Sequence, residues 1–220
     1  MPKINWREHL STILDLIFPP TCLACKKSGS YLCANCVKLL PAANKTAENY
    51  SAIFAYQHPV VKHAIHLLKY RGGKILARDL AKLLHQHLNL EQNSEKFLVI
   101  PIPSSKNREK KRGYNQAREL ARELVKLAPE KLELGENILV KVKDTVSQVK
   151  TKSKTERLEN LRDAFAILEN QNQIMREKIT NQQIILLDDV ITTGATMNEA
   201  RKVLIEAGTR NVLALALARG

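Results

Sequence analysis

Cysteine is absent from most of this chain. All four cysteines lie between residues 22 and 36, and the rest of the 220 residues contain none. So tight a grouping indicates one local site rather than disulfides spread through a fold. In a cytosolic protein glutathione keeps thiols reduced, which disfavours two disulfides here and favours metal ligation.

Long hydrophobic runs are also missing. No stretch of the sequence approaches the roughly 18 consecutive apolar residues that a membrane span needs. The first residues lack the succession of a charged region, an apolar run and a small-residue cleavage site that marks a secretory signal. We therefore expect no membrane span and a cytoplasmic location.

Acidic residues are fewer than basic ones. Asp and Glu number 22 against 35 Lys and Arg, which gives a formal net charge of +13. Such an excess favours polyanionic partners, namely nucleic acid or phosphorylated metabolites. A solvated, solubilising surface explains the same excess equally well, so charge alone selects no function.

The apolar pattern predicts an α/β fold. The length suits one core of about 150 to 180 residues with a small appendage, which we place at residues 50–220 and 1–45. Short apolar segments alternate with helical repeats, so we expect a mostly parallel sheet with helices on both faces. The predicted strands are 51–57, 97–100, 138–140, 164–168, 184–187 and 212–217, and the predicted helices are 4–17, 60–70, 75–90, 113–128 and 196–207. Ligands of such sheets bind beyond the carboxyl ends of the strands, which points to the loops after Ile100 and Leu187.

The cysteines form two Cys-x-x-Cys pairs, in the order Cys22-x2-Cys25-x7-Cys33-x2-Cys36. Each pair can present two thiolates to one tetrahedral Zn²⁺ at about 2.3 Å, and the insert can fold back between the pairs. Four cysteine ligands close the site, so we expect a structural zinc module whose folding depends on the metal. A redox pair or an iron–sulfur cluster is the alternative.

A second motif follows the clearest predicted strand. Ile184 to Leu187 leads without a gap into Asp188-Asp189-Val190-Ile191-Thr192-Thr193-Gly194-Ala195-Thr196. The carboxylates can accept hydrogen bonds from two vicinal hydroxyls, and the later residues can wrap a phosphate with backbone amides at a helix N-terminus. Glycine permits a close backbone approach, while threonine adds hydroxyl donors. A strand-end turn or a plain helix cap explains either half of this motif, but not the whole string.

Residues 184–196 resemble the fingerprint of type I phosphoribosyltransferases, which bind 5-phosphoribosyl-1-pyrophosphate (PRPP). The resemblance implies that fold, with Asp188 and Asp189 on the ribose hydroxyls. It implies that the 5-phosphate is enclosed by Thr192, Thr193, Gly194, Ala195 and Thr196. It also implies a loop that holds the pyrophosphate with Mg²⁺, for which the candidates are Ser104, Ser105 and Lys106. Some purine-salvage members carry an aspartate base where this chain has Thr192, so transfer to a nucleobase is in doubt.

Basic residues accompany two aromatic residues elsewhere in the chain. One group follows the candidate pyrophosphate loop and consists of Arg108, Lys110, Lys111, Arg112 and Tyr114. The other consists of Lys69 and Arg71, on either side of a tyrosine and before two glycines. Cations can hold phosphates while a ring stacks on a base, so both groups are candidates for phosphate or DNA contacts. A solvated charged face, or a helix C-terminus capped by glycine for the second group, is the alternative.

Taken in order, these motifs resemble the ComF family of competence proteins. The resemblance extends from about Leu16 to Arg219. It is carried by the four cysteines, Lys69-Tyr70-Arg71-Gly72, Pro101-Ile102-Pro103-Ser104, Arg112-Gly113-Tyr114-Asn115-Gln116, a segment from Gln148 to Phe165 with Arg157 and Asn160, the fingerprint and a terminal Leu-Ala-Arg. It implies a role in natural transformation, with single-stranded DNA and proteins of the competence machinery as partners. An active phosphoribosyltransferase of nucleotide metabolism and a transcriptional regulator with the same pocket are the other hypotheses.

Overall fold

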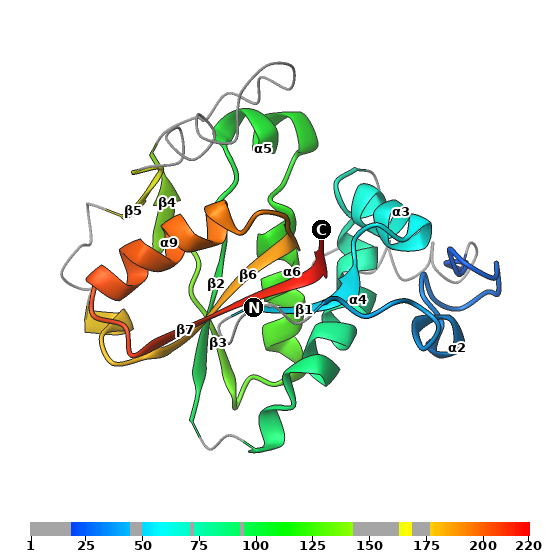
Figure 1. The fold of residues 1–220 in the computed structure, drawn as a ribbon, viewed down its shortest axis with the longest axis horizontal. Coiled ribbons are helices and arrows are strands. Elements are labelled where there is room, and N and C mark those ends of the chain that lie inside the picture. Colours follow the sequence, from blue (N-terminus) through cyan, green and yellow to red (C-terminus); the bar gives the residue numbers. More distant parts are fainter. Residues whose placement is uncertain (1–18, 45–49, 71–72, 93–94, 143–162, 169–176) are drawn as a thin grey trace, which may run out of the picture.

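A five-stranded sheet forms the centre of the protein, and all of its strands pair in parallel (Figure 1). The structure is a computed structural model that describes residues 19–44, 50–70, 73–92, 95–142, 163–168 and 177–220. The strand order is β1-β7-β6-β2-β3, with β1 at Tyr50–Ala55, β2 at Phe97–Pro101, β3 at Leu132–Leu134, β6 at Gln183–Ile191 and β7 at Asn211–Arg219.

The central strand β6 is buried on both faces of the sheet. Ile185 and Leu187 pack into a cluster with three helices on one face, while Ile184 and Leu186 pack into a second cluster on the other face. Each of these four side chains is at most 1% exposed. Successive side chains of a strand point to opposite faces, so a continuous apolar run suits a strand covered on both sides.

Helices cover the two faces as the sequence predicted. Helices α3 (Pro59–Leu68), α4 (Gly73–Leu88) and α6 (Gln116–Leu127) lie on one face, and α9 (Ala195–Glu206) lies on the other (Figure 1). In α3 the buried residues recur at spacings of three and four, which is the pattern of a helix with one apolar side. The predicted mostly parallel sheet with helices on both faces is thus confirmed.

The chain connections create a switch point between β2 and β6. After β2 the chain passes through α6 and joins β3, whereas after β6 it passes through α9 on the opposite face and joins β7. Connections that diverge in this way leave a crevice outside the carboxyl ends of the two strands. The two loops predicted to carry the chemistry begin at these two strands.

Several elements differ from the sequence-based expectations. Strand β6 continues to Ile191 instead of ending at Leu187, because β7 is long enough to pair with it as far as Arg219. The predicted strands 138–140 and 164–168 form β4 (Leu139–Lys141) and β5 (Phe165–Ile167), which pair antiparallel in a separate sheet. The predicted helix 113–128 begins only at Gln116, because the Asn115 side chain caps it.

Four short elements were not predicted. They are α2 (Ala34–Val37), the 3-10 helix η1 (Leu90–Gln92), β3 and the basic helix α5 (Lys106–Arg112). Ser105 caps the start of α5, and Gly113 ends it in the left-handed conformation at a φ of 84°. That backbone conformation favours glycine, because glycine has no Cβ.

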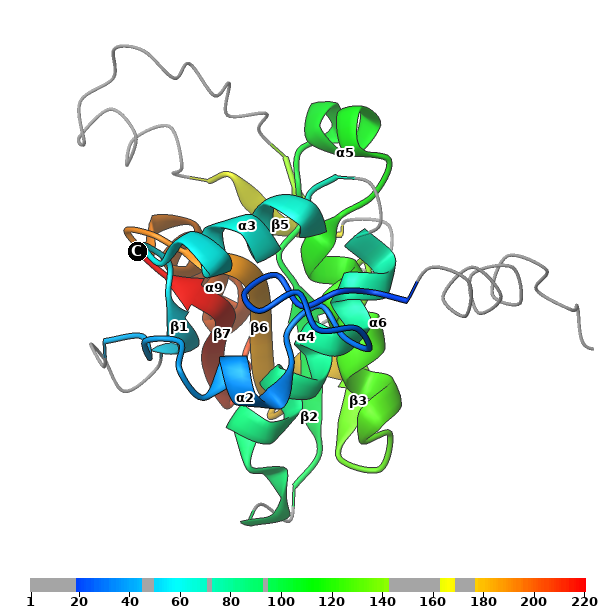
Figure 2. The same cartoon turned by 90° about the vertical axis from the view of Figure 1, so that its right-hand side faces the viewer.

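The cysteine segment lies against α4 and shares a core with the sheet (Figure 2). Leu32 is only 8% exposed and packs into the cluster that includes α3 and α4. The Tyr31 backbone N–H donates to the Asp79 carboxylate at 3.3 Å, and Ala42 forms a bridge with Phe54 of β1. The appendage is therefore packed onto the domain through both apolar and polar contacts.

None of the helices in the described part of the chain is long and apolar enough to cross a membrane. The predicted helix 4–17 lies outside the described residues, as do Arg71, Arg157 and Asn160.

Candidate functional site

The crevice at the switch point opens where β2 leaves the sheet. The last pair of the β2–β6 ladder is Pro101 with Leu187, and the Ile102 N–H donates to the Leu187 carbonyl at 2.8 Å. Beyond Leu187, β6 pairs only with β7 among the described strands, from Asp188 opposite Ala216 to Ile191 opposite Arg219. The acidic pair and the loop after β2 therefore border the same opening.

Asp188 and Asp189 belong to β6 itself, so the expectation that they open a loop was wrong. Their backbone is held by the ladder to β7, which positions both carboxyl groups more firmly than a loop would. Strand alternation directs Asp189 toward the face that α3 covers. The Asp189 N–H donates to Asp188 Oδ1 at 2.8 Å, which ties the two residues together.

The Asp188 carboxyl group is enclosed by protein, although the residue keeps some exposed surface. Burial, followed by the charge of neighbouring Asp189, raises the pKa of Asp188 well above its ordinary value. The Asp189 N–H and the Lys69 ammonium act in the opposite direction. Two adjacent carboxylates in such a place resist double ionisation, which makes the site receptive to cations and hydroxyl donors.

Lys69 is the cation of this acidic pair. It is the first residue after α3, and its Nζ lies 3.2 Å from Asp189 Oδ2. The two side chains are only 25% and 12% exposed. Lys69 was a candidate for phosphate or DNA contact, which stays a prediction, and the structure brings it to the fingerprint motif. The sequence offers no signal for this contact.

The end of the fingerprint leads directly into α9. Gly194 is the N-cap of this helix and has a φ of 77°, a left-handed conformation that favours glycine. Thr192 and Thr193 are exposed, and the Thr193 hydroxyl accepts from the Ala195 N–H at 3.4 Å. Ala195 and Thr196 form the first turn of the helix, whose free N–H groups and dipole favour an anion. The predicted phosphate loop thus has suitable geometry.

Tyr50 packs against one side of this loop and was not predicted from the sequence as a site residue. A Cβ at Gly194 would lie 3.4 Å from Tyr50 Cε1, and the Tyr50 hydroxyl donates to Asn198 in the first turn of α9. The Arg219 guanidinium lies 5.6 Å from the centre of the tyrosine ring. Burial raises the pKa of Tyr50 despite the nearby charges of Arg201 and Arg219. Tyr50 follows the linker to the main domain, where no local pattern marks it.

The three candidates for the pyrophosphate loop differ in their surroundings. The Ser104 hydroxyl oxygen is buried and has no hydrogen-bond partner among the described residues. Ser105 is 8% exposed, and its hydroxyl accepts from the Arg108 N–H at 3.4 Å, so it caps α5. Lys106 is exposed at the start of this helix. Ser104 therefore offers the free hydroxyl of the three.

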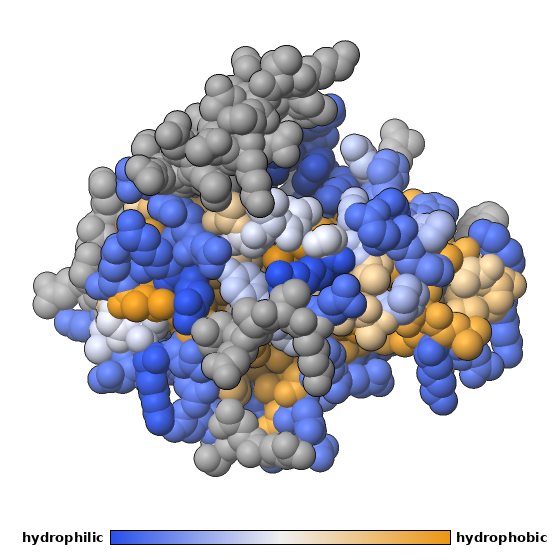
Figure 3. Space-filling view, in the orientation of Figure 1, coloured by the Kyte–Doolittle hydropathy of each residue, from blue (hydrophilic) through white to orange (hydrophobic). Residues whose placement is uncertain are grey.

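Helix α5 projects beyond the carboxyl end of β2 and carries most of the basic candidates (Figure 1). Lys106, Arg108, Lys110 and Lys111 are exposed, and hydrophilic residues cover much of the face of the molecule that Figure 3 shows outside the grey segments. Arg112 instead donates to Gln116 at 2.9 Å. The structure thus gathers four cations on one projecting helix next to the crevice.

Tyr114 and Asn115 connect the basic arm to the rest of the site. The Tyr114 hydroxyl lies within hydrogen-bond distance of the Leu68 and Tyr70 carbonyls, 3.0 Å from the latter. Burial raises the pKa of this hydroxyl, which favours its role as a donor. The Asn115 side chain donates to the Ile102 carbonyl at 2.9 Å and accepts from the Ala117 N–H at 2.9 Å. Whether Tyr114 also stacks on a base stays a prediction.

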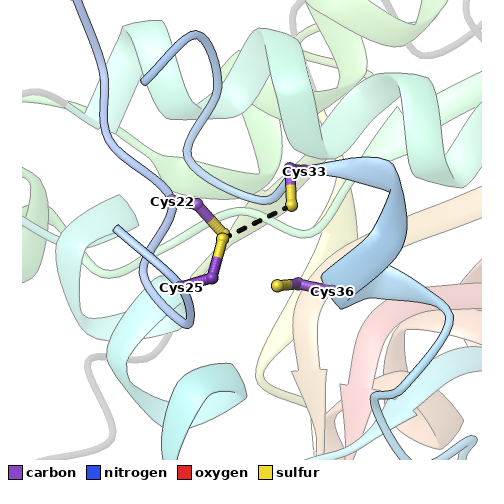
Figure 4. A group of neighbouring side chains, drawn as sticks. All are labelled: Cys22, Cys25, Cys33 and Cys36. Carbon is purple, nitrogen blue, oxygen red and sulfur yellow. Dashed lines mark hydrogen bonds between the residues drawn. The ribbon is translucent and has the colours of Figure 1, made fainter. Parts of the chain in front are cut away.

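The four cysteines come together at a second candidate site (Figure 4). Their sulfur atoms all lie within 4.8 Å of one another, and those of Cys25 and Cys33 are 3.7 Å apart. Sulfur atoms bound to one tetrahedral zinc are about 3.8 Å apart, given Zn–S bonds of about 2.3 Å. All four cysteines are free thiols, so the cluster matches the predicted ligand set.

Electrostatics within this cluster also suit a cation. Burial raises the pKa of Cys22, but the backbone N–H groups of Cys25, Cys33 and Ala24 outweigh it and bring this pKa to about 6. Hydrogen bonds with the Cys25 and Cys33 side chains, together with burial, raise the pKa of Cys36 to about 12. One thiolate forms readily while another resists ionisation, and a divalent cation would relieve that resistance.

Models of two known families match this chain. A model of the phosphoribosyl transferase domain matches residues 70–220, and a model of the double zinc ribbon domain matches residues 13–57. The first match contains the acidic pair, the candidate phosphate loop and α5, and the second contains all four cysteines.

Individual relatives extend the similarity over most of the chain. Competence protein F of Haemophilus influenzae is 29% identical over 209 residues, which cover 91% of this chain and 85% of that protein. Competence protein ComFC of Streptococcus pneumoniae is 28% identical and covers 88% of this chain and 83% of its own length. A hypoxanthine phosphoribosyltransferase of Staphylococcus aureus with a solved structure is 13% identical, covers 65% of this chain and 62% of its own, and has a TM-score of 0.39.

The motif-based resemblance is therefore confirmed at the level of the family. The described fold, the match over residues 70–220 and the cysteine cluster agree with one another. The chain belongs to the phosphoribosyl transferase domain family, and over most of its length it is similar to the ComF competence proteins.

Proposed function

We propose that the crevice between β2 and β6 binds PRPP together with Mg²⁺. The observation that carries this proposal is the acidic pair at the end of a central strand, directly before a left-handed glycine and a helix N-terminus. The Asp188 and Asp189 carboxylates accept hydrogen bonds from the ribose hydroxyls, and the N–H groups and threonine hydroxyls at the α9 N-terminus donate hydrogen bonds to the 5-phosphate. The pyrophosphate then extends toward Ser104, whose buried hydroxyl lacks a partner in the described residues.

A hard cation such as Mg²⁺ would be held here mainly by the pyrophosphate, ribose oxygens and water, so a dedicated set of protein ligands is not needed. Its chemistry when bound would be to neutralise charge on the pyrophosphate. Transfer of the phosphoribosyl group is the alternative function at the same crevice. Charge stabilisation of an oxocarbenium-like transition state does not require an aspartate at Thr192, so the alternative remains compatible with this sequence.

Binding of PRPP is measured by isothermal titration calorimetry in the presence of Mg²⁺. Asp188→Asn and Asp189→Asn should each weaken binding about tenfold or more, because a hydrogen bond to a charged acceptor contributes about 1.5–3 kcal/mol. Glu206→Gln at the far end of α9 is the matched control and should bind as the wild type does. No binding by the wild type, or equal binding by all four proteins, would refute the proposal. Pyrophosphate release with an acceptor base would favour the transferase.

Thermal unfolding tests the buried charge of Asp188. Its folded-state pKa is raised, so its contribution to stability is full below about pH 4, the ordinary pKa, and is lost as the pH rises through the folded-state value. Asp188→Asn removes this loss of stability. Each kcal/mol by which the free energy of unfolding increases raises the Tm by roughly 2–4 °C. We expect the variant to be more stable than the wild type at pH 8, with a smaller difference at pH 4.5. A difference that does not depend on pH would contradict the assignment.

We propose that single-stranded DNA is a second ligand, contacted by the exposed cations of α5. Four cations on one short helix next to the crevice form a surface suited to a phosphate backbone. Arg112, Tyr114, Lys69 and Arg71 are further candidates at its border. Because the relatives are named as competence proteins, we infer a role in DNA uptake during natural transformation, in the cytoplasm and with proteins of the competence machinery.

DNA binding is measured by fluorescence anisotropy at several salt concentrations. Replacing Arg108, Lys110 and Lys111 by glutamine should weaken binding of a labelled oligonucleotide and reduce the salt slope by about 2, at roughly 0.7 per lost phosphate contact. The matched control replaces Lys126, Lys178 and Lys202, which are exposed elsewhere and pair with acids. Equal loss in both triple variants would indicate a nonspecific effect of net charge and reject α5 as the contact surface.

We propose that the cysteine cluster binds one structural Zn²⁺. The distances between the sulfur atoms, the packing of Leu32 in the main core and the double zinc ribbon match support this assignment. A site with four cysteines leaves no open position for a substrate. Zinc would therefore stabilise the fold and take no part in the chemistry of the crevice.

Metal analysis of the purified protein tests this assignment. We expect about one zinc per chain, loss of that zinc in Cys36→Ser, and a lower Tm for this variant because metal binding contributes to folding. Asn35→Ser changes the exposed neighbour of Cys36 in α2 and should keep both the zinc and the Tm. Iron with visible absorption would establish an iron–sulfur cluster instead, and a metal-free protein of unchanged Tm would reject any structural metal.

A further inference from the structure

The motifs around Lys69 and Tyr114 meet in space, although 44 residues separate Tyr70 from Tyr114. The Tyr114 hydroxyl reaches the carbonyls of Leu68 and Tyr70, which lie on either side of Lys69 in the chain. The last carbonyls of a helix have no partner within the helix, so a side-chain donor at this point satisfies them. The single hydroxyl hydrogen is donated to one of these carbonyls or shared between them, so Tyr114 contacts the backbone on both sides of Lys69.

The position of Tyr114 is also fixed by the hydrogen bonds of its neighbour Asn115. The next residue, Asn115, is 3% exposed, and its side chain joins the Ile102 carbonyl after β2 to the first N–H groups of α6. The end of α3, the end of β2 and the start of α6 are thus linked through two adjacent residues. Such a junction fixes the backbone from which the Lys69 side chain extends.

Lys69 points at Asp189. Its ammonium lies 3.2 Å from Oδ2, an oxygen that is shielded from solvent and makes no hydrogen bond within the described part of the chain. The contact is an ion pair rather than an aligned hydrogen bond. A buried carboxylate oxygen without a compensating charge is costly, so removal of Lys69 affects Asp189 directly.

We propose that Lys69 is a positioning residue of the phosphoribosyl site, which holds the Asp189 carboxylate turned so that Oδ2 faces the ammonium and Oδ1 is left for a ribose hydroxyl. Tyr114 holds Lys69 in place for this purpose. The inference rests on the proposed binding of PRPP for its ligand, but the ion pair itself is independent of that ligand.

The charge of Lys69 matters because two carboxyl groups lie next to each other in this site. Asp188 and Asp189 are adjacent, and the negative charge of Asp189 raises the pKa of Asp188. Lys69 opposes this effect. Without the ammonium the two carboxyl groups would share a proton up to a higher pH, and a protonated carboxyl group is a poorer acceptor for a hydroxyl.

The first experiment needs no ligand. Carbon-13 NMR of the aspartate carboxyl groups follows the titration of the pair in the wild type and in Lys69→Met, which keeps the length and apolar stem of the side chain. We expect the titration to move to higher pH in Lys69→Met and to stay unchanged in Lys126→Met, an exposed cation on α6. An unchanged titration in Lys69→Met would overturn the inference, whatever the ligand results are.

A double-mutant cycle on PRPP affinity then separates positioning from direct contact. Lys69→Met should weaken binding of Mg²⁺-PRPP about tenfold, with a larger loss at low pH. If Lys69 acts through Asp189, the double variant Lys69→Met/Asp189→Asn binds no more weakly than Asp189→Asn alone, because the effects of coupled residues are not additive. Additive losses without a pH shift would mean that Lys69 contacts the ligand itself and would reject the positioning role.

Tyr114→Phe tests how Lys69 is held. Loss of the hydroxyl should weaken PRPP binding by a smaller factor than Lys69→Met, and should have no further effect in a Lys69→Met background. An equal loss in both backgrounds would separate Tyr114 from Lys69 and overturn that link. If the wild type binds no PRPP while the NMR titration shifts as expected, the proposed ligand is rejected and the pairing of Lys69 with Asp189 stands.

Discussion

The backbone ladder between β6 and β7 is the constraint on which the candidate site depends. It continues from Leu187 to Ile191 after β2 has left the sheet at Pro101. The extra length holds the acidic pair in an extended strand, and the departure of β2 opens the space beside it. The glycine loop and α9 then follow at a defined position. A shorter β7 would leave the same residues in a loop, with carboxyl groups that are less firmly placed.

The site places charge where the fold does not favour it. Asp188 lies next to a second carboxylate, and Lys69 at the end of α3 offsets that charge. Such arrangements are typical of functional sites, where stability is reduced in return for a polar group aimed at a ligand. The apolar clusters on both faces of β6 stabilise the strand that carries these two carboxyl groups.

The cysteine module is connected to the same core. Leu32 packs with α3 and α4, and α3 ends at Lys69. The cysteine segment thus packs in the same core as α3, and Lys69 at the end of α3 contacts the acidic pair. The division into residues 1–45 and 50–220 stays a prediction, and the shared core indicates that the two parts are packed together rather than joined only by a linker.

Much of the fold and both candidate sites could be predicted from local sequence. Apolar periodicity identifies the parallel sheet and its main helices, the cysteine spacing identifies the cysteine cluster, and an uninterrupted string marks the candidate phosphate loop. These features depend on neighbours within a few residues. The extension of β6, the packing of Tyr50 against Gly194 and the pairing of Lys69 with Asp189 depend on segments far apart in the chain. Only the tertiary structure decides them, because strand partners and ion pairs of this kind leave no periodic signal in the sequence.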